Sequence, residues 1–335
     1  PKPSSAASDV YKRQELGAFD HNSTLTVFPL DKSLAHIEEQ AYGGKVETDY
    51  GLFSASGNMK FQESLYFEVQ VTGNFFNGTK GRRSEHKTTL RAINHVINHD
   101  DEERSINRYI KLPATNVNIF TQLTAARICT LLKKAAGYNE MSHTITDIYQ
   151  NASEQALKEV LTAFSISDIY VSMLSIDPTR ASFSQYNAPA SMMAAVSNIL
   201  LTSVDEELLD TFFTEWDKDF APDGRIDNED IKESIRDGQQ SLKYTNVYKQ
   251  LDSFYKAYDF KSDFPEFWKF VDRNGDGILD KQDKPDDFEI TEEELTPSKQ
   301  QCIQLLEQVN KYLRDFLQTE CVWAVSYTHL RAHET

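Results

Sequence analysis

One segment of the chain places oxygen-bearing side chains at the spacing that a calcium ion requires. Between Asp272 and Asp283 they stand at positions one, three, five, nine and twelve of a loop, and Gly277 stands at position six. Ca2+ binds about six to eight oxygen ligands, and glycine at position six allows the sharp turn that points alternate residues inward. The predicted ligands, which include the main-chain carbonyl of residue 278, are Asp272, Asn274, Asp276, Ile278, Asp280 and Asp283.

The end of this loop differs from that of a calcium sensor. Position twelve is Asp283 rather than glutamate, and Pro285 follows closely. Because proline disfavours a continuing helix, we expect no long exiting helix and therefore no groove that opens on calcium binding. The pattern favours a dockerin-like loop in which calcium stiffens a junction. The alternative is a turn rich in Asp, Asn and Gly that holds no ion.

A second, weaker copy of the pattern lies between residues 217 and 230. Its second half, DGRIDNED, repeats DGILDKQD of the first loop, but its first half does not fit. Counting from Asp219 puts Ala221 at position three, and counting from Asp217 requires two inserted residues. Two interpretations stay open: a calcium site, or carboxylates that cap a helix beginning near Asn228. The candidate ligands are Asp217, Asp219, Asp223, Arg225, Asp227 and Asp230.

Other motifs that carry chemistry are missing from the sequence. His95 and His99 have the spacing of a zinc protease motif, but the glutamate is lacking and the stretch resembles a strand. There is no Gly-x-Ser-x-Gly segment, no phosphate-binding glycine loop and no Cys-x-x-Cys pair. We therefore expect no zinc site, no disulfide framework and no enzyme.

The charge and hydropathy of the chain limit its partners. A formal net charge of −17 repels phosphate, so nucleic-acid binding is not expected. The same acidic excess suits calcium and cationic partners. The longest uncharged, mostly apolar run, residues 191–204, is too short to cross a bilayer, and no transmembrane segment is expected.

Alternating apolar and polar residues dominate the chain from about residue 25 to residue 117. These short segments, separated by turns such as Gly43-Gly44 and Asn77-Gly78, predict a small antiparallel β-sandwich. One strand should place Leu65, Phe67, Val69 and Val71 on one face and Tyr66, Glu68 and Gln70 on the other.

Helical periodicity replaces this alternation after residue 118. The expected fold is therefore α+β, with a β-sandwich followed by an all-α domain that carries an EF-hand-like or dockerin-like loop. The Met192-Met193 pair is interpreted as core packing. Predicted helices cover residues 119–136, 153–164, 188–201, 204–216, 228–238, 241–258 and 298–318.

Both ends of the chain look like translated sequencing-library adapters. Residues 4–14, SSAASDVYKRQ, match the translation of a transposase adapter, and residues 325–335, VSYTHLRAHET, match the complement of its partner. We expect a native fragment whose true termini are missing. The predicted division is adapter 1–14, β-sandwich 15–118, helical domain 119–260 with the degenerate loop 217–230, calcium-loop segment 261–290, a helix opening a further module 291–324, and adapter 325–335.

Several segments together resemble a family of bacterial surface or secreted lipoproteins. They are TLTVFPLD, TDYGLFSAS, FEVQVTGNFFNGTKG, TTLRAI, TNVNIFTQLTAARICTLL, ASEQALKEVLTAFSI, DGRIDNEDI and DRNGDGILD. The resemblance implies a carboxypeptidase-regulatory-like, or transthyretin-like, β-sandwich, then a helical domain and a dockerin-like calcium loop. It also implies an extracytoplasmic location, either secreted or anchored at the outer membrane and cell surface, and no known catalysis. The insertion around residues 94–111 departs from the family pattern.

Three functions follow as hypotheses. The first is a calcium-binding, non-catalytic structural or interaction region of a cell-surface or secreted protein, with surface proteins or glycans as partners. The alternative is an accessory binding module of a surface glycan-processing enzyme, in which Phe75, Phe76 or Tyr42 could stack on sugars, although buried aromatics are the simpler interpretation. The third is a hydrolase, which would require a cleft with two carboxylates of split pKa values.

Overall fold

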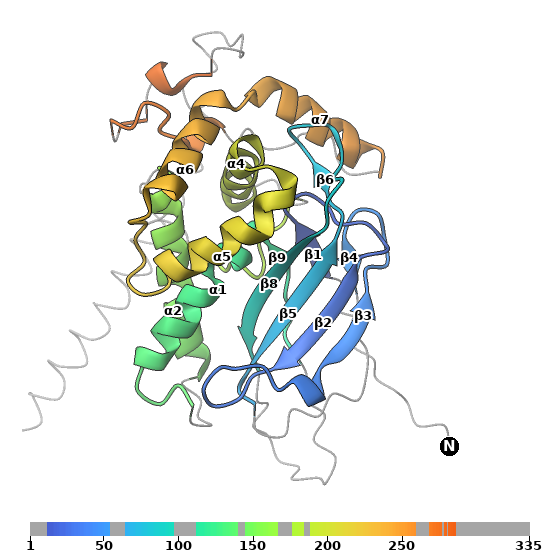
Figure 1. Ribbon diagram of the computed structural model, residues 1–335, viewed down its shortest axis with the longest axis vertical. Coiled ribbons are helices and arrows are strands. Elements are labelled where there is room, and N and C mark those ends of the chain that lie inside the picture. The colour runs from blue at the N-terminus through green and yellow to red at the C-terminus, as the bar shows by residue number, and fades with distance from the viewer. Residues whose placement is uncertain are drawn as a thin grey trace, which may run out of the picture. The chain divides into compact units, whose positions relative to one another are not determined.

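Strands occupy the first third of the chain and helices follow them, which confirms the predicted α+β order (Figure 1). The computed structural model describes residues 12–53, 64–96, 112–139, 145–166, 176–183, 188–258, 268–276, 278–279 and 281–285. All of these belong to one compact unit. The predicted helix 298–318, Gly277, Asp280, His99 and the tail 325–335 lie outside the described residues.

The main sheet has four strands in the order β3-β2-β5-β8, and every neighbouring pair is antiparallel. In its register Leu25 lies opposite Val71, and Val69 lies opposite Ala92. These four side chains are buried, as the alternating pattern predicts for one face. The strands are β2 (Thr24–Pro29), β3 (Tyr42–Lys45), β5 (Tyr66–Gly73) and β8 (Thr88–His95).

Two smaller sheets complete the β region. One has the order β4-β1-β9, in which β1 is antiparallel to β4 but parallel to β9, so the β region is not wholly antiparallel. Residues 12–14, predicted to be an adapter translation, belong to the backbone of β1. The other sheet is a hairpin of β6 and β7. The strands are β1 (Lys12–Glu15), β4 (Leu52–Phe53), β6 (Phe76–Asn77), β7 (Arg82–Arg83) and β9 (Val117–Asn118).

The helices begin close to their predicted starts, with two exceptions. The Asn118 side chain accepts a hydrogen bond from the Thr121 amide and caps the first helix. The second helix begins at Ile145, before its predicted start at Ser153, and α5 begins after a 3-10 turn at Glu206–Leu208. The helices are α1 (Ile119–Lys134), α2 (Ile145–Ala163), α4 (Ala188–Ser203), α5 (Leu209–Phe220), α6 (Glu229–Ser241) and α7 (Tyr244–Lys256).

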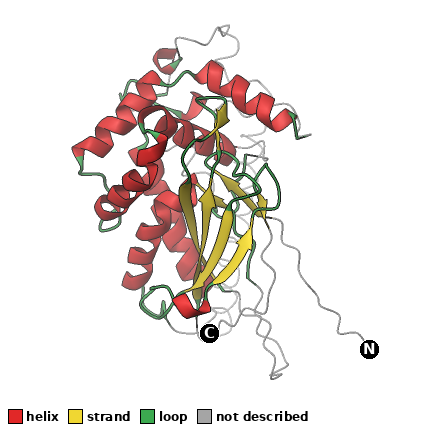
Figure 2. Cartoon of the chain, turned by 45° about the vertical axis from the view of Figure 1, so that its right-hand side comes forward, coloured by secondary structure: helices red, strands yellow, loops and turns green. Residues whose placement is uncertain are grey.

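Strands and helices share one hydrophobic core. Figure 2 shows the helices gathered on one side of the strands. The face of β5 that carries Tyr66 and Glu68 is covered by them, and these residues are only 2% and 3% exposed. The predicted boundary at residue 118 therefore lies inside a continuous core. Its members include Leu30, Leu65, Tyr66 and Ile93 from the β region and Ala125, Ile128, Leu132, Tyr149 and Ala156 from α1 and α2.

Helix α4 is buried along most of its length. Met192 and Met193 have no exposed surface, which confirms their interpretation as core packing. Within the described ranges, no helix combines the length and apolar character needed to cross a membrane.

Candidate functional site

The predicted calcium loop is attached to the core at its first residue. Val271 is fully buried and forms an isolated antiparallel bridge with Ile166, just after α2. The amide of Asp272 donates to the carbonyl of Ser165 at 3.1 Å. The apolar residue before the loop therefore fixes the position of the first candidate ligand against the end of a helix.

Three candidate ligands fold back over the loop. The Asp272 Oδ1 atom accepts from the Gly275 amide at 2.8 Å, the Asn274 Oδ1 atom accepts from Asp276 at 2.9 Å, and Asp276 Oδ1 accepts from Ile278 at 2.8 Å. Gly275 has φ of 74°, a left-handed conformation that glycine adopts without strain. Successive turns of this kind bring alternate side-chain oxygens toward the interior of a loop.

The two ends of the loop lie together. The Asp283 Oδ1 atom accepts from the amides of Arg273, at 2.8 Å, and of Asn274, at 3.3 Å. The carboxylates at positions one and twelve are mostly shielded from water, with 9% exposure at Asp272 and 3% at Asp283, whereas Ile278 is 61% exposed. A short 3-10 helix, Lys281–Asp283, leads to Pro285. The loop is thus closed at its ends, but its described carboxylates, Asp272, Asp276 and Asp283, do not converge into a group that could hold a metal ion.

The weaker loop has a different arrangement. Helix α5 continues through Asp217 and Asp219, and the Asp217 carboxylate contacts the guanidinium of Arg91 on β8. The Asp219 Oδ2 atom accepts from the amides of Asp227 and Asn228, at 2.8 and 3.1 Å. The Asn228 side chain accepts from two amides of α6. The cap of α6 is therefore the amide side chain of Asn228, and the Asp219 carboxylate binds the two amides just before the helix.

The remaining candidates of this loop lie at its surface. The Asp223 Oδ1 atom accepts from the Arg225 amide at 3.0 Å. Arg225, Asp227 and Asp230 are exposed, and Asp230 lies in the first turn of α6. Across the described residues, no three acidic, histidine or cysteine side chains converge as a metal site would require.

A buried arginine of α1 supports the weaker loop by donating hydrogen bonds to its main chain. Arg127 is 4% exposed and donates from Nη1 to the carbonyls of Ala221, at 3.1 Å, and Pro222, at 2.9 Å. Its other nitrogens form a bidentate pair with Glu159, at 2.7 and 2.9 Å. Counted from Asp219, Ala221 stands at position three of the weaker loop and offers no side-chain ligand. Its main-chain carbonyl accepts instead from the positively charged guanidinium of Arg127.

Gly224 allows the loop to approach this ion pair. It has φ of 79°, and a Cβ atom there would lie 2.2 Å from the Glu159 carboxyl group. Only glycine accommodates both the conformation and the close approach.

The main sheet carries a buried ionic network that was not predicted from the sequence. Glu68 of β5 accepts from Gln70 Nε2 at 2.6 Å, and its carboxylate lies 3.1 Å from His36 Nε2 and 3.7 Å from Arg91 Nη1. Arg91 also contacts Asp217. The only sequence signal is an acidic residue within the apolar strand YFEVQV.

The two carboxylates of this network differ in acidity. Burial alone would raise the pKa of Glu68, but the hydrogen bond from His36 and the charge of Arg91 lower it. Burial raises the pKa of Asp217 to about 6, despite the opposing effect of Arg91. Both carboxylates contact the same guanidinium, whereas a hydrolytic pair needs the substrate between its members. The network does not support the hydrolase hypothesis.

Comparison of the chain with protein-family models, with curated proteins and with solved structures finds no match.

Proposed function

We propose that the loop from Asp272 to Asp283 binds one Ca2+ ion and that the chain is a calcium-stabilised, non-catalytic region of a bacterial cell-surface or secreted protein. The observation that carries the proposal is the closure of the loop: Asp283 at position twelve accepts from the amides of Arg273 and Asn274 near position one, and both Asp272 and Asp283 are largely buried. Carboxylates at the two ends of a short closed loop are oxygen ligands of the kind that Ca2+ prefers. Asp280 would complete the set from outside the described residues.

The position of the loop indicates what the ion would do. Asp272 and Val271 contact Ser165 and Ile166, so a bound ion would fasten the loop to the end of α2. This is the dockerin-like role, in which calcium stiffens a junction. The proposal includes an extracytoplasmic location, because millimolar extracellular calcium suits weak loops of this kind. It also includes the resemblance to the β-sandwich lipoprotein family.

The alternative, a glycan-binding accessory module, loses two of its three aromatic candidates. Phe75 has no exposed surface and Phe76 is 7% exposed, so neither can stack on a sugar. Tyr42 is half-buried. The three predicted aromatic residues therefore do not form an exposed surface on which a sugar could stack.

Calcium titration by calorimetry tests the proposal. The wild-type chain should bind one ion, and the double variant Asp272→Ala/Asp276→Ala should bind none. At free calcium about 100-fold above the dissociation constant, the ion should stabilise the wild type by about 2.7 kcal/mol. Thermal unfolding with and without a chelator should show this stabilisation in the wild type alone.

The matched control is Asp223→Ala/Asp227→Ala, which removes two carboxylates from the weaker loop and should leave the stoichiometry at one. Two ions bound by the wild type, with one lost in this control, would assign calcium to the weaker loop as well. A wild-type chain that binds no calcium at millimolar concentration would refute the proposal.

A further inference from the structure

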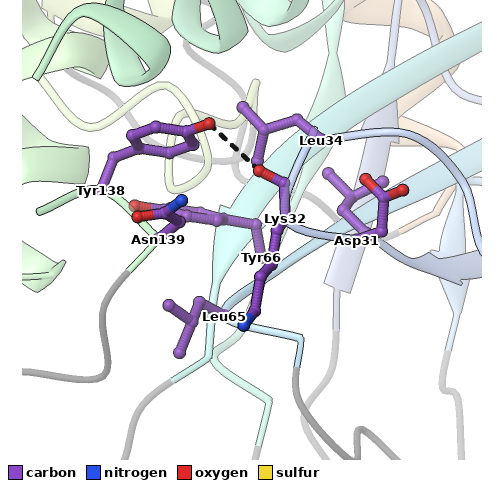
Figure 3. A pocket seen from close by; sticks show the side chains of 8 residues that line it. Asp31, Lys32, Leu34, Leu65, Tyr66, Tyr138 and Asn139 are labelled. Carbon is purple, nitrogen blue, oxygen red and sulfur yellow. Dashed lines mark hydrogen bonds between the residues drawn. The ribbon is translucent and has the colours of Figure 1, made fainter.

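A small pocket lies where the segment after β2 meets the rest of the molecule. The segment from Asp31 to Ala41, here called the 31–41 segment, forms one wall with Asp31, Lys32 and Leu34 (Figure 3). Leu65 and Tyr66 of the β region and Tyr138 and Asn139, which follow α1, form the others. The Tyr138 hydroxyl donates to the carbonyl of Lys32 at 3.1 Å, so the segment closes over the pocket.

One of the residues that line the pocket, Tyr66, has an unsatisfied polar group. The hydroxyl of Tyr66 is buried and has no hydrogen-bond partner, and burial raises its pKa far above the ordinary value. A buried hydroxyl without a partner costs free energy, which an open pocket would relieve by admitting water or a ligand. Leu34 opposes opening, because it packs against the core cluster that contains Tyr66.

One titratable contact holds the 31–41 segment on the sheet. The His36 ring lies between two carboxylates, with Nε2 3.1 Å from Glu68 and Nδ1 3.5 Å from Glu38. It stacks on Phe28 with ring centroids 4.2 Å apart and an interplanar angle of 5°. Only the protonated imidazole can donate from both nitrogens, so this geometry matches its charged form.

Charged and titratable groups from β8, α5 and α1 surround Glu68 and the 31–41 segment. Glu68 faces Arg91 of β8, which is shared with Asp217 of α5. From α1, Lys133 acts on Asp31, and the buried thiol of Cys129 stays neutral because burial raises its pKa to about 11. One guanidinium therefore serves two carboxylates. The second positive charge near Glu68 is that of His36.

We propose that the 31–41 segment is a lid over the Tyr66 pocket and that protonated His36 is the latch that holds it shut. When His36 loses its proton, one of its nitrogens presents a lone pair to a carboxylate and its attraction to Glu68 weakens. The lid then opens more often and exposes Tyr66 together with its apolar neighbours. This inference does not rest on calcium binding.

The direction of the pH dependence follows from the latch. The hydrogen bond with Glu68 is the largest cause that raises the pKa of His36 above its ordinary value of 6.5. A group whose pKa is raised on folding stabilises the folded arrangement fully below its unfolded pKa. The stabilisation disappears as the pH rises through the folded value. The lid should therefore be closed at acidic pH and looser at alkaline pH.

Amide hydrogen exchange of the 31–41 segment tests the proposal, together with titration of His36 by NMR in the wild type. After correction for the intrinsic pH dependence of exchange, protection should fall about tenfold as the pH rises from about 5.5 to about 8.5. In His36→Gln, which keeps a hydrogen-bond donor without a titratable charge, protection should be low and independent of pH.

The control is His86→Gln, because His86 is half exposed and lies 3.9 Å from Glu207, away from the lid. It should behave as the wild type does. The proposal is overturned if the protection of the 31–41 segment keeps the same pH dependence in His36→Gln. It is also overturned if His36 of the wild type titrates at or below about 6.5, a result that needs no folded variant.

Discussion

Replacement of Arg127 by methionine should lower the free energy of unfolding by about 3–5 kcal/mol, because it breaks a buried ion pair and leaves Glu159 without its partner. The same substitution leaves the carbonyls of Ala221 and Pro222 without the donor that they share. Methionine nearly keeps the length of the side chain, so the loss reports on charge and hydrogen bonding. Chemical denaturation followed by tryptophan fluorescence measures it.

The matched control is Lys134→Met, which removes another donor to the Pro222 carbonyl, at 3.2 Å, from an exposed position. It should change stability by no more than about 0.5 kcal/mol. If Arg127→Met and Lys134→Met have equal effects, the guanidinium does not support the weaker loop. If calcium restores the stability of Arg127→Met, that loop takes an ion once the protein's own cation is removed.

Replacement of Trp216 by alanine should destabilise the fold by about 3–5 kcal/mol. Trp216 is fully buried on α5, and its indole donates to the Leu123 carbonyl at 2.9 Å. Its ring lies 4.8 Å from Phe220 and 5.8 Å from Phe164 between centroids, so the indole joins α5 to α1 and to the residue just after α2. Alanine leaves a large cavity and removes the indole hydrogen bond, while the Leu123 carbonyl keeps its partner within α1.

Thermal unfolding at several scan rates measures this loss, and Trp216→Phe separates its parts. Phenylalanine keeps most of the packing and loses the hydrogen bond, so it should cost about 1–2 kcal/mol. Leu208→Ala, at a position with 51% exposure, should be nearly neutral. Equal losses for Trp216→Ala and Leu208→Ala would contradict the buried position of the indole.

The sequence predicts the elements of this fold well where periodicity is strong. The strand from Tyr66 to Gly73 and the helix from Ala188 to Ser203 lie where alternation and a continuous apolar run place them. The first turns of α2, before Ser153, were not predicted. Ile145 and Tyr149 already lie on its buried face, but the polar residues around Asn151 suggest a break, and tertiary packing overrides that local preference.

The covering of the sheet could not be predicted in the same way. Alternation correctly separates Phe67 and Val69 from Tyr66 and Glu68, yet it cannot say that helices bury the second face too. A charged residue in a strand is normally assigned to solvent. Glu68 is buried because Arg91 and His36, both distant in sequence, reach it in the folded chain.

For the candidate sites, too, local features could be predicted from the sequence and long-range contacts could not. The spacing from Asp272 onward predicts the ligand set, because all its members come from one short segment. The attachment of that loop to Ser165 and the support of the weaker loop by Arg127 are long-range contacts, and no local pattern reports them.

The hydrogen bond from Ser197 of α4 to the carbonyl of Leu16 joins residues 181 positions apart. A ribosome that adds about 5–20 residues per second needs roughly 10–35 s to synthesise that interval. Throughout it, strand β1 can pair with β4 and later with β9, but the helix that covers its end has not yet been made. Until β9 is made, β1 has a partner on one side only, so the nascent chain presents an open strand edge that can pair with the strands of other chains.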